Sequence, residues 1–455
     1  MDDTEDFREI SLNQMLEFFP DQEQLIRFEC PNAKCFYATT DSTHLFRHKQ
    51  SCRSKTIITC KQTAKGRPDN SVRLALEREN IIPDSDWQNW HFCCYDVECF
   101  MEPKVDSNGQ SKNVHRLVSI AVKSSFGDNS EFYIERNSMD PQELKPMMEK
   151  FRAHLTDQRE EMLNYIPDSV IRGQKEYQDL RSSENFKFLS VAQQNKIKDK
   201  LRYLNDCLKL RIFSWNGERY DNNVVWAPLL DNFQHFQKEF EKMHIIRRGT
   251  GIMQFTFGHL VFRDFLNFSS PMSLDSFSKS CGVTETEKTV YPYELYQDIS
   301  TLRTETAFPP YPLFKSSLQK VSDENAEELI QLANEQISTG FWKDPSDVLK
   351  FFQFTPELEL KTENDIITAV EINGDASLTD ILHTSPKKYF NSKKIFDDSC
   401  ENMSQYLERY NLNDVVLLEQ CVREYAKGFW ETWQVNIHNY MSLPSVAQGK
   451  RANYI

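Results

Sequence analysis

Two carboxylates stand one residue apart inside an apolar, cysteine-rich run, HFCCYDVECF. Side chains alternate along a β-strand, so Asp96 and Glu98 point to the same face if this run is a strand. Two buried acids on one face repel each other unless a cation lies between them. Divalent metal is the usual solution. The same spacing recurs in plainly acidic sequence at Asp21 and Glu23, so other motifs must decide whether this pair binds metal.

Two later stretches add acids in suitable settings. In SWNGERYDNNVVWAPLL, Asn216, Tyr220 and Asp221 lie where a buried strand gives way to a polar turn and then a helix. In YNLND, Tyr410 and Asp414 are four residues apart and share one face of the last helix. Each pattern arises by chance elsewhere in the chain, whereas the ordered set of three is much harder to obtain that way. The set predicts a site that contains several acids.

In this order the motifs resemble the three exonuclease motifs of family B DNA polymerases: Asp-x-Glu, Asn-x3-(Phe/Tyr)-Asp and Tyr-x3-Asp. The resemblance implies an α/β, RNase H-like fold, a mixed sheet flanked by helices. It implies two Mg²⁺ or Mn²⁺ ions, held by the four acids Asp96, Glu98, Asp221 and Asp414. Hard cations take oxygen ligands, which suits Asp and Glu. In the family these ions support removal of nucleotides from the 3′ end of DNA.

The resemblance also implies roles for the polar residues beside the acids. Tyr410 would orient the attacking water, and Asn216 with Tyr220 would contact the single-stranded 3′ end. Core packing is an equal alternative for Tyr220. The cysteines of the first motif, Cys93, Cys94 and Cys99, are expected to pack in the core, as free cysteines usually do.

A second resemblance narrows the family. Ser273, Leu274 and Phe277 of MSLDSFSKSCGV are similar to a motif of protein-primed family B polymerases that contacts single-stranded DNA and the priming protein. The alternative is a helix start, with Ser273 capping and Leu274 packing. EKTVYPYELY resembles a Lys-x2-aromatic motif followed by Pro-Tyr-Glu in the same branch, which implies a phosphate contact for Lys288. The implied partners are DNA with a single-stranded 3′ end and a terminal priming protein.

The polymerase motifs of the palm domain, Asp-x2-Ser-Leu-Tyr-Pro and Tyr-x-Asp-Thr-Asp, do not occur in the sequence. YMSLPSVAQGKRANYI, at the end of the chain, resembles the segment just before the palm. We therefore expect a 3′-5′ exonuclease of polymerase type, without DNA synthesis by this chain alone. Two alternatives stay open: an inactive, nucleic-acid-binding remnant of a transposon polymerase, and a free-standing exonuclease on DNA or RNA.

The N-terminal part has the spacing of a ββα zinc finger. Cys30-x4-Cys35-x12-His48-x3-Cys52 predicts a zinc site in which cysteine replaces the last histidine. His44 lies one helical turn before His48; we expect it on the surface of the finger, with substitution as a ligand as the alternative. The helix and its exit are basic, which suits DNA or RNA contact, and docking to a protein is an equal possibility.

The elements that must position these residues follow from the sequence pattern. We expect a hairpin of strands around HFCCYDVECF and RLVSIAVKSS, charged helices over 141–210, a buried strand at 210–215 and a long helix over 403–429. The expected segments are an N-terminal stretch at 1–28, the zinc finger at 29–56, a linker at 57–84, the exonuclease domain with insertions at 85–430 and the start of a truncated palm region at 431–455.

Composition limits the classes of function. The 455 residues carry a net charge of −14, which argues against a surface that coats nucleic acid but leaves room for a local basic groove. We expect no membrane partner, because no stretch approaches 18 consecutive apolar residues. Eleven unevenly spaced cysteines favour reduced thiols and an intracellular protein, and a nuclear site is compatible with the sequence without being determined by it.

Overall fold

The computed structural model describes a subset of the chain: residues 28–29, 38–39, 71–83, 87–105, 111–232, 243–283, 289–309, 313–314, 386–433 and 435–447. The chain divides into two compact units, Met1–Lys65 with Lys450–Ile455, and Gly66–Gly449. In the first unit, β1 (Phe28–Glu29) pairs antiparallel with β2 (Ala38–Thr39). The predicted zinc ligands Cys30, Cys35, His48 and Cys52 lie outside the described residues.

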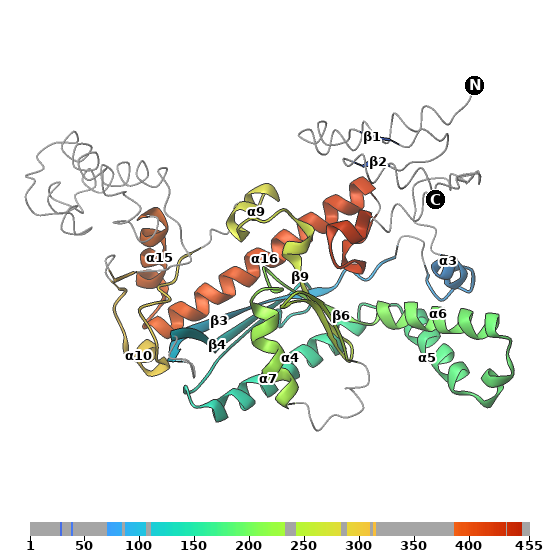
Figure 1. Cartoon of the computed structure of the whole chain (residues 1–455), viewed down its shortest axis with the longest axis horizontal. Coiled ribbons are helices and arrows are strands. Elements are labelled where there is room, and N and C mark those ends of the chain that lie inside the picture. Colours follow the sequence, from blue (N-terminus) through green and yellow to red (C-terminus); the bar gives the residue numbers. More distant parts are fainter. Residues whose placement is uncertain are drawn as a thin grey trace, which may run out of the picture. The chain divides into compact units, whose positions relative to one another are not determined.

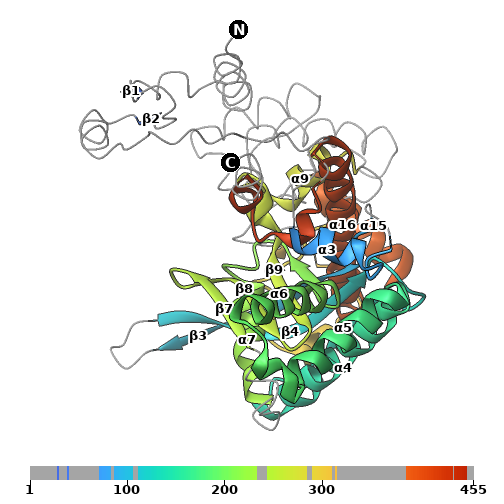
Figure 2. The same cartoon turned by 90° about the vertical axis from the view of Figure 1, so that its right-hand side faces the viewer.

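A seven-stranded mixed sheet forms the core of the second unit (Figure 1). Its strands are β3 (Phe92–Val105), β4 (Ser111–Ser124), β5 (Glu131–Glu135), β6 (Leu210–Ser214), β7 (His244–Arg248), β8 (Gly251–Phe257) and β9 (Leu260–Asp264). The order across the sheet is β5-β4-β3-β6-β9-β8-β7. The pairs β5–β4, β4–β3, β9–β8 and β8–β7 are antiparallel, whereas β3–β6 and β6–β9 are parallel. The predicted hairpin is β3–β4, which extends past the other strands (Figure 2).

Helices flank this sheet. They are α3 (Ser71–Arg78), α4 (Leu144–Leu163), α5 (Asp168–Ser182), α6 (Val191–Cys207), α7 (Asp221–Asn232), α9 (Leu274–Ser280), α10 (Ile299–Thr304), α15 (Pro386–Ser399) and α16 (Met403–Trp433). Short 3-10 turns occur at η2 (Pro141–Glu143), η3 (Glu184–Phe188), η4 (Phe265–Phe268) and η7 (Ile437–Asn439). The predicted α/β class and the helices over 141–210 are therefore confirmed. None of the described helices is long and apolar enough to cross a membrane.

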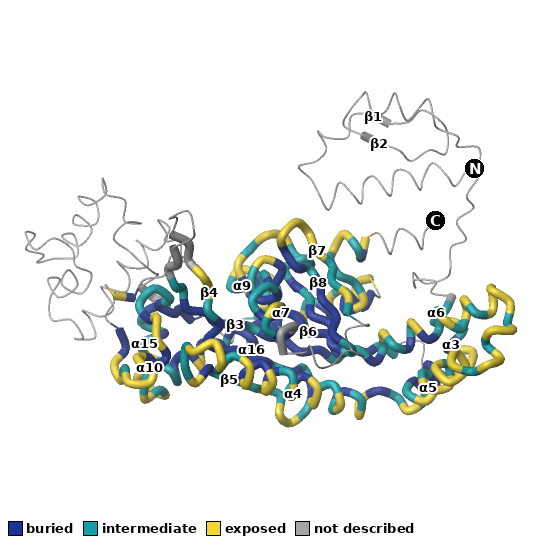
Figure 3. The backbone as a smooth tube through the Cα atoms, turned by 60° about the horizontal axis from the view of Figure 1, so that its bottom comes forward, coloured by how far each residue is buried: buried dark blue, intermediate teal, exposed yellow. Residues whose placement is uncertain are grey.

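The two faces of the sheet are covered by different helices. On one face, Tyr95 and Val97 of β3 pack with Phe151 and Leu155 of α4 and with Val225 of α7. On the other face, apolar residues of β3, β4 and β6 pack with α16 and α9. The strands beneath both layers are largely buried, whereas much of α5 and α6 is exposed (Figure 3). The α7 and α16 helices, one on each face, carry the later acidic motifs.

The long C-terminal helix is continuous over 31 residues. We expected this helix to end near Gly428, but α16 continues through that glycine to Trp433. A side chain at position 428 would have no atom from another part of the described chain within 4 Å of its Cβ. Its apolar stripe, which includes Leu407, Val415 and Val422, is buried against the sheet. Burial of this stripe explains why the helix runs straight across the sheet face (Figure 1).

Two expected boundaries differ from the structure. Residues 71–78, placed in a linker by their basic, breaker-rich neighbourhood, form α3, which buries Leu76 against Leu204 and Leu208 beside α6. Residues 435–447, expected to begin a separate palm region, bury Val435 and Ile437 in the same core as α16. Both segments belong to the larger unit because each has apolar side chains that only this core can cover.

Candidate metal centre

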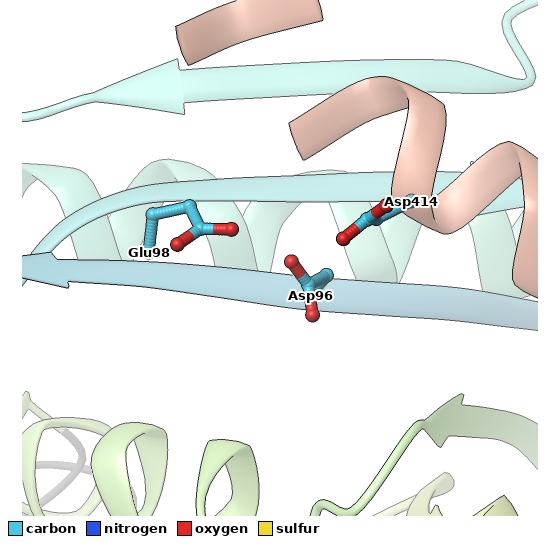
Figure 4. A group of neighbouring side chains, drawn as sticks. All are labelled: Asp96, Glu98 and Asp414. Carbon is cyan, nitrogen blue, oxygen red and sulfur yellow. The ribbon is translucent and has the colours of Figure 1, made fainter. Parts of the chain in front are cut away.

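Three carboxylates from two distant parts of the chain meet between β3 and α16. One oxygen each of Asp96, Glu98 and Asp414 lies within 4.8 Å of the others. Figure 4 shows Asp96 and Glu98 on the strand and Asp414 on the helix, directed toward the same space. Glu98 and Asp414 are buried, and Asp96 is half-buried. Such a group of oxygen donors could hold a metal ion, and hard cations such as Mg²⁺ and Mn²⁺ fit it best.

Strand β3 presents its two acids as the alternation predicted. Asp96 pairs with Ala121 and Glu98 with Ser119 on β4, so small side chains stand beside both acids. Immediately after Glu98 the register shifts, because Val118 is an extra residue on β4. Bulges of this kind re-aim side chains and are frequent next to functional sites.

Helix α16 is fixed against the strands at the same level. Asn411, fully buried, donates a hydrogen bond of 2.9 Å from its Nδ2 to the hydroxyl of Ser119, the partner of Glu98 in the strand pairing. Asp414 follows Asn411 by three residues and therefore lies on the same side of the helix. This contact sets the depth at which the Asp414 carboxylate approaches β3.

Tyr410 lies beside the acids, as predicted, and has a partner that the sequence reading missed. Its hydroxyl is 2.9 Å from that of Tyr293. Burial raises the pKa of Tyr410 well above its ordinary value, and the nearby Asp414 and Glu98 carboxylates raise it further. The phenol thus stays protonated and can donate a hydrogen bond. The signal for Tyr293 was its place in EKTVYPYELY, but a contact across 117 residues could not be inferred from spacing.

The fourth predicted acid, Asp221, lies close to the group but outside it. It is the first residue of α7 and is buried, and it accepts a hydrogen bond from the backbone N–H of Val97. Pairing of β6 with β3 ends at Cys94, which leaves this part of the β3 edge open to the Asp221 carboxylate. Burial raises its pKa strongly, with added repulsion from Asp96 and Asp264. Asp221 is thus electrostatically coupled to the site.

The turn before α7 is held by Asp264, a buried acid that the sequence reading did not single out. Its carboxylate accepts hydrogen bonds from the backbone N–H groups of Glu218 at 3.0 Å and Leu266 at 2.9 Å. Burial raises the pKa of Asp264 to about 6. Within the turn, Asn216 has a φ of 63°, a conformation that asparagine tolerates better than most residues. A Cβ at Gly217 would lie 1.9 Å from the hydroxyl of Ser214, so a larger residue there would force that buried side chain to move.

Tyr220 takes part in both packing and polar contacts. Its ring packs against the apolar core under α4 and α7, and its hydroxyl is 3.0 Å from Nδ1 of His115 on β4. The core-packing alternative therefore describes its ring. Contact of Asn216 or Tyr220 with nucleic acid stays a prediction.

The structure places the Ser-Leu-x2-Phe motif at the start of α9. Ser273 is the N-cap and accepts from the backbone N–H of Ser276 at 3.1 Å. Leu274 and Phe277 are buried, and the ring of Phe277 lies 4.8 Å from that of Trp215. This is the helix-start alternative, and a role of these residues in binding DNA or a priming protein stays a prediction. Lys288 lies outside the described residues.

The cysteines near the acids are core residues. Cys93, Cys94 and Cys99 are free and buried, as expected. Burial raises the pKa of Cys93 to about 12, so its thiol stays protonated and is a poor metal ligand. The metal-binding chemistry of this region thus belongs to the carboxylates.

Comparison of the chain with known protein families, with curated proteins and with solved structures finds no match in any of the three. The geometry of the acids and their surroundings therefore carries the functional argument.

Proposed function

We propose that this protein is a metal-dependent 3′-5′ exonuclease on DNA, of the type associated with family B DNA polymerases. The observation that carries the proposal is the meeting of Asp96, Glu98 and Asp414 from two motifs 316 residues apart in the sequence. Their approach in space, between one strand and one helix, is what a shared metal site requires.

The fold is compatible with this proposal. An RNase H-like domain is a mixed sheet flanked by helices, and the larger unit is a seven-stranded mixed sheet with α4 and α7 on one face and α16 on the other. We propose that it is RNase H-like.

The residues have distinct proposed roles. Asp96, Glu98 and Asp414 would hold Mg²⁺ or Mn²⁺, and Asp221, coupled to Asp96, would complete the set for a second ion. Bound metal would supply a low-pKa water and stabilise the charge that develops on a phosphate. The protonated Tyr410 hydroxyl, held by Tyr293, would orient that water through a hydrogen bond.

The substrate proposed is the single-stranded 3′ end of DNA, positioned by Asn216 and Tyr220 beside the acids. Ser273, Leu274, Phe277 and Lys288 are proposed to serve a priming protein or the DNA strand. The N-terminal finger is proposed to hold Zn²⁺ through its predicted ligands. These assignments follow from the resemblance and depend on the nuclease activity being present.

The test is degradation of a 5′-labelled single-stranded DNA in Mg²⁺ or Mn²⁺, with zinc-loaded full chain. We expect metal-dependent shortening from the 3′ end, abolished by EDTA and by the double variant Asp96→Asn, Glu98→Gln. The matched control is Asp179→Asn, Glu176→Gln, which makes the same two changes on the exposed surface of α5. Two results would contradict the proposed nuclease activity: folded protein that leaves the DNA intact, or a control variant that loses as much activity as the double variant. The first would favour an inactive protein that only binds nucleic acid.

A further inference from the structure

A second polar region lies on the same sheet as the acids, toward the far end of α16. A cavity of about 550 Å³ is bounded there by β6, β8 and β9, by α3 and α6, by the end of α16 and by residues 435–441. Cavities of this size commonly hold small ligands. The site residues described above do not line it.

Two arginines in this cavity form no ion pair with any carboxylate that the structure describes. Arg211 and Arg263 lie on neighbouring parallel strands and share the sheet face of Phe213. Both donate to one atom, the backbone carbonyl oxygen of His438, from Arg211 Nε at 2.7 Å and from Arg263 Nη1 at 2.5 Å. In the described part of the chain, neither is within ion-pair distance of an acid. The shared acceptor holds the two guanidinium groups side by side.

Side-by-side burial of two cations is unfavourable without an anion. Burial lowers the pKa of both arginines, and the repulsion from Arg211 contributes to the lowering of Arg263 to about 9. The other cations of the cavity are already paired, Arg73 with Glu77 at 2.8 Å and Lys209 with Asp206 at 2.5 Å. The Asp206 carboxylate also attracts both arginines, so the net positive charge of the cavity comes from the arginine pair and is offset only in part.

The two arginines differ in their hydrogen-bonding capacity. Arg211 is buried and donates from all three guanidinium nitrogens, with Nε to His438, Nη1 to Lys209 and Nη2 to Asn439 and the Asp206 carbonyl. Arg263 uses Nε for Gln254 and Nη1 for the carbonyls of His438 and Tyr440. Its Nη2 makes no hydrogen bond to any residue that the structure describes, although Arg263 lines the cavity. A planar guanidinium with a free edge is suited to an anionic oxygen, above all a phosphate.

Aromatic rings line the same cavity. They are Trp87, Tyr203, Trp430 and Tyr440, all half-buried. Rings with partly open faces are the usual platforms on which nucleobases stack. A cavity that combines an arginine pair with such rings has complementary groups for both halves of a nucleotide.

We propose that this cavity binds a nucleoside phosphate, with the phosphate hydrogen-bonded to Arg263 next to the charge of Arg211 and the base on the surrounding tryptophan and tyrosine rings. The nucleotide is free in solution or part of a strand, since both present the same chemistry. The site is separate from the acids: Trp430 follows Asp414 by sixteen positions on α16, a distance of about 24 Å at 1.5 Å per residue. The inference does not rest on the exonuclease proposal.

Calorimetric titration of the full chain in EDTA tests the inference without metal at the acids. We expect dAMP to bind about tenfold or more tightly than deoxyadenosine, because only dAMP brings a phosphate to the arginines. Arg263→Gln should weaken dAMP binding by about tenfold or more, whereas Arg263→Lys should retain part of it. The matched control, Arg181→Gln on exposed α5, should bind dAMP as the unmodified chain does.

A single-stranded oligothymidylate identifies the source of the nucleotide. Its competition with dAMP, with the same dependence on Arg263, would assign the cavity to a DNA strand, and dAMP binding without competition would assign it to a free nucleotide. Trp87→Ala provides a second test if Arg263→Gln fails to fold, since it should weaken dAMP but not inorganic phosphate. Absence of dAMP and oligothymidylate binding, or equal affinities in folded Arg263→Gln and unmodified chain, would overturn the inference. A finding that the protein has no nuclease activity would not bear on this nucleotide site.

Discussion

Around residues 95–98, the two faces of β3 bury side chains of opposite character. Toward α4 and α7 the strand presents Tyr95 and Val97 to a closely packed apolar core. Toward α16 the alternate positions are Asp96 and Glu98, where burial brings carboxylates together. The first face has the composition expected of a stabilising core, whereas the second brings together carboxylates that could hold a metal ion. Substitutions toward α4 and α7 should therefore affect mainly stability, and substitutions toward α16 mainly activity.

The largest effect is expected from the acids themselves. Asp414→Asn removes one charged ligand while keeping its size, and metal-dependent DNA shortening should fall by about 10³-fold or more, because metal contributes several kcal/mol to the transition state. Initial rates on 5′-labelled DNA measure this. Asp179→Asn on α5 is the control, and a similar rate for Asp414→Asn and this control would contradict the assignment.

Substitutions on the face of β3 toward α4 should lower the stability of the protein and leave the nuclease rate nearly unchanged. Leu155→Ala empties a fully buried position under β3 and should lower the free energy of unfolding by about 2–5 kcal/mol, with little change in the rate per folded molecule. Urea denaturation and the DNA assay at low temperature measure the two quantities. Leu180→Ala, at a position that is 41% exposed, should change neither. A stable Leu155→Ala variant without activity would break the separation.

Asp264 is an exception, a buried acid on the α7 side. Its pKa of about 6 in the folded protein exceeds the unfolded value of 3.8, so its stabilising contribution is complete below about pH 4 and is lost as the pH rises through 6. The loss amounts to up to about 3 kcal/mol, at about 1.4 kcal/mol per pKa unit.

Denaturation of Asp264→Asn and the unmodified chain between pH 4 and 7 measures this contribution, with the exposed Asp128→Asn as control. The free energy of unfolding of the unmodified chain, relative to that of Asp264→Asn, should decrease as the pH rises from 4 to 7. A constant or growing advantage would show that Asp264 is charged throughout.

The smallest effects concern the tyrosine pair. Tyr410→Phe should reduce the rate of DNA shortening by about 10- to 100-fold through loss of the hydroxyl beside the acids. Tyr293→Phe should have a smaller effect, because its hydroxyl acts by holding that of Tyr410. Tyr165→Phe, at a half-exposed ring, serves as control. A larger loss from Tyr293→Phe than from Tyr410→Phe would reverse the assigned roles.

Local periodicity was enough to predict much of the site. Alternation along β3 placed Asp96 and Glu98 together, and the four-residue spacing placed Tyr410 and Asp414 on one side of α16. The same reasoning predicted the strand β6 and the start of α7. These features depend on neighbours within a few residues, which a sequence pattern records directly.

The features that were not predicted depend on contacts between distant segments. Asp221 lies outside the group of three acids, and its carboxylate reaches the β3 edge only because pairing of β6 with β3 stops at Cys94, a detail of sheet geometry. Tyr293 contacts Tyr410 across a separation of 117 residues, which no local pattern records. The segment α3 was missed although Val72 and Leu76 have helical spacing, since its basic neighbours suggested a linker.

The central claim is that the carboxylates between β3 and α16 hold catalytic metal. Anomalous diffraction from crystals of the protein soaked in Mn²⁺ tests it most directly. The account predicts a manganese peak bonded to Asp96, Glu98 and Asp414, and a second peak toward Asp221 at about 3.5–4 Å from the first when DNA is bound. Manganese that binds elsewhere, or crystals without a peak among these carboxylates, would contradict it.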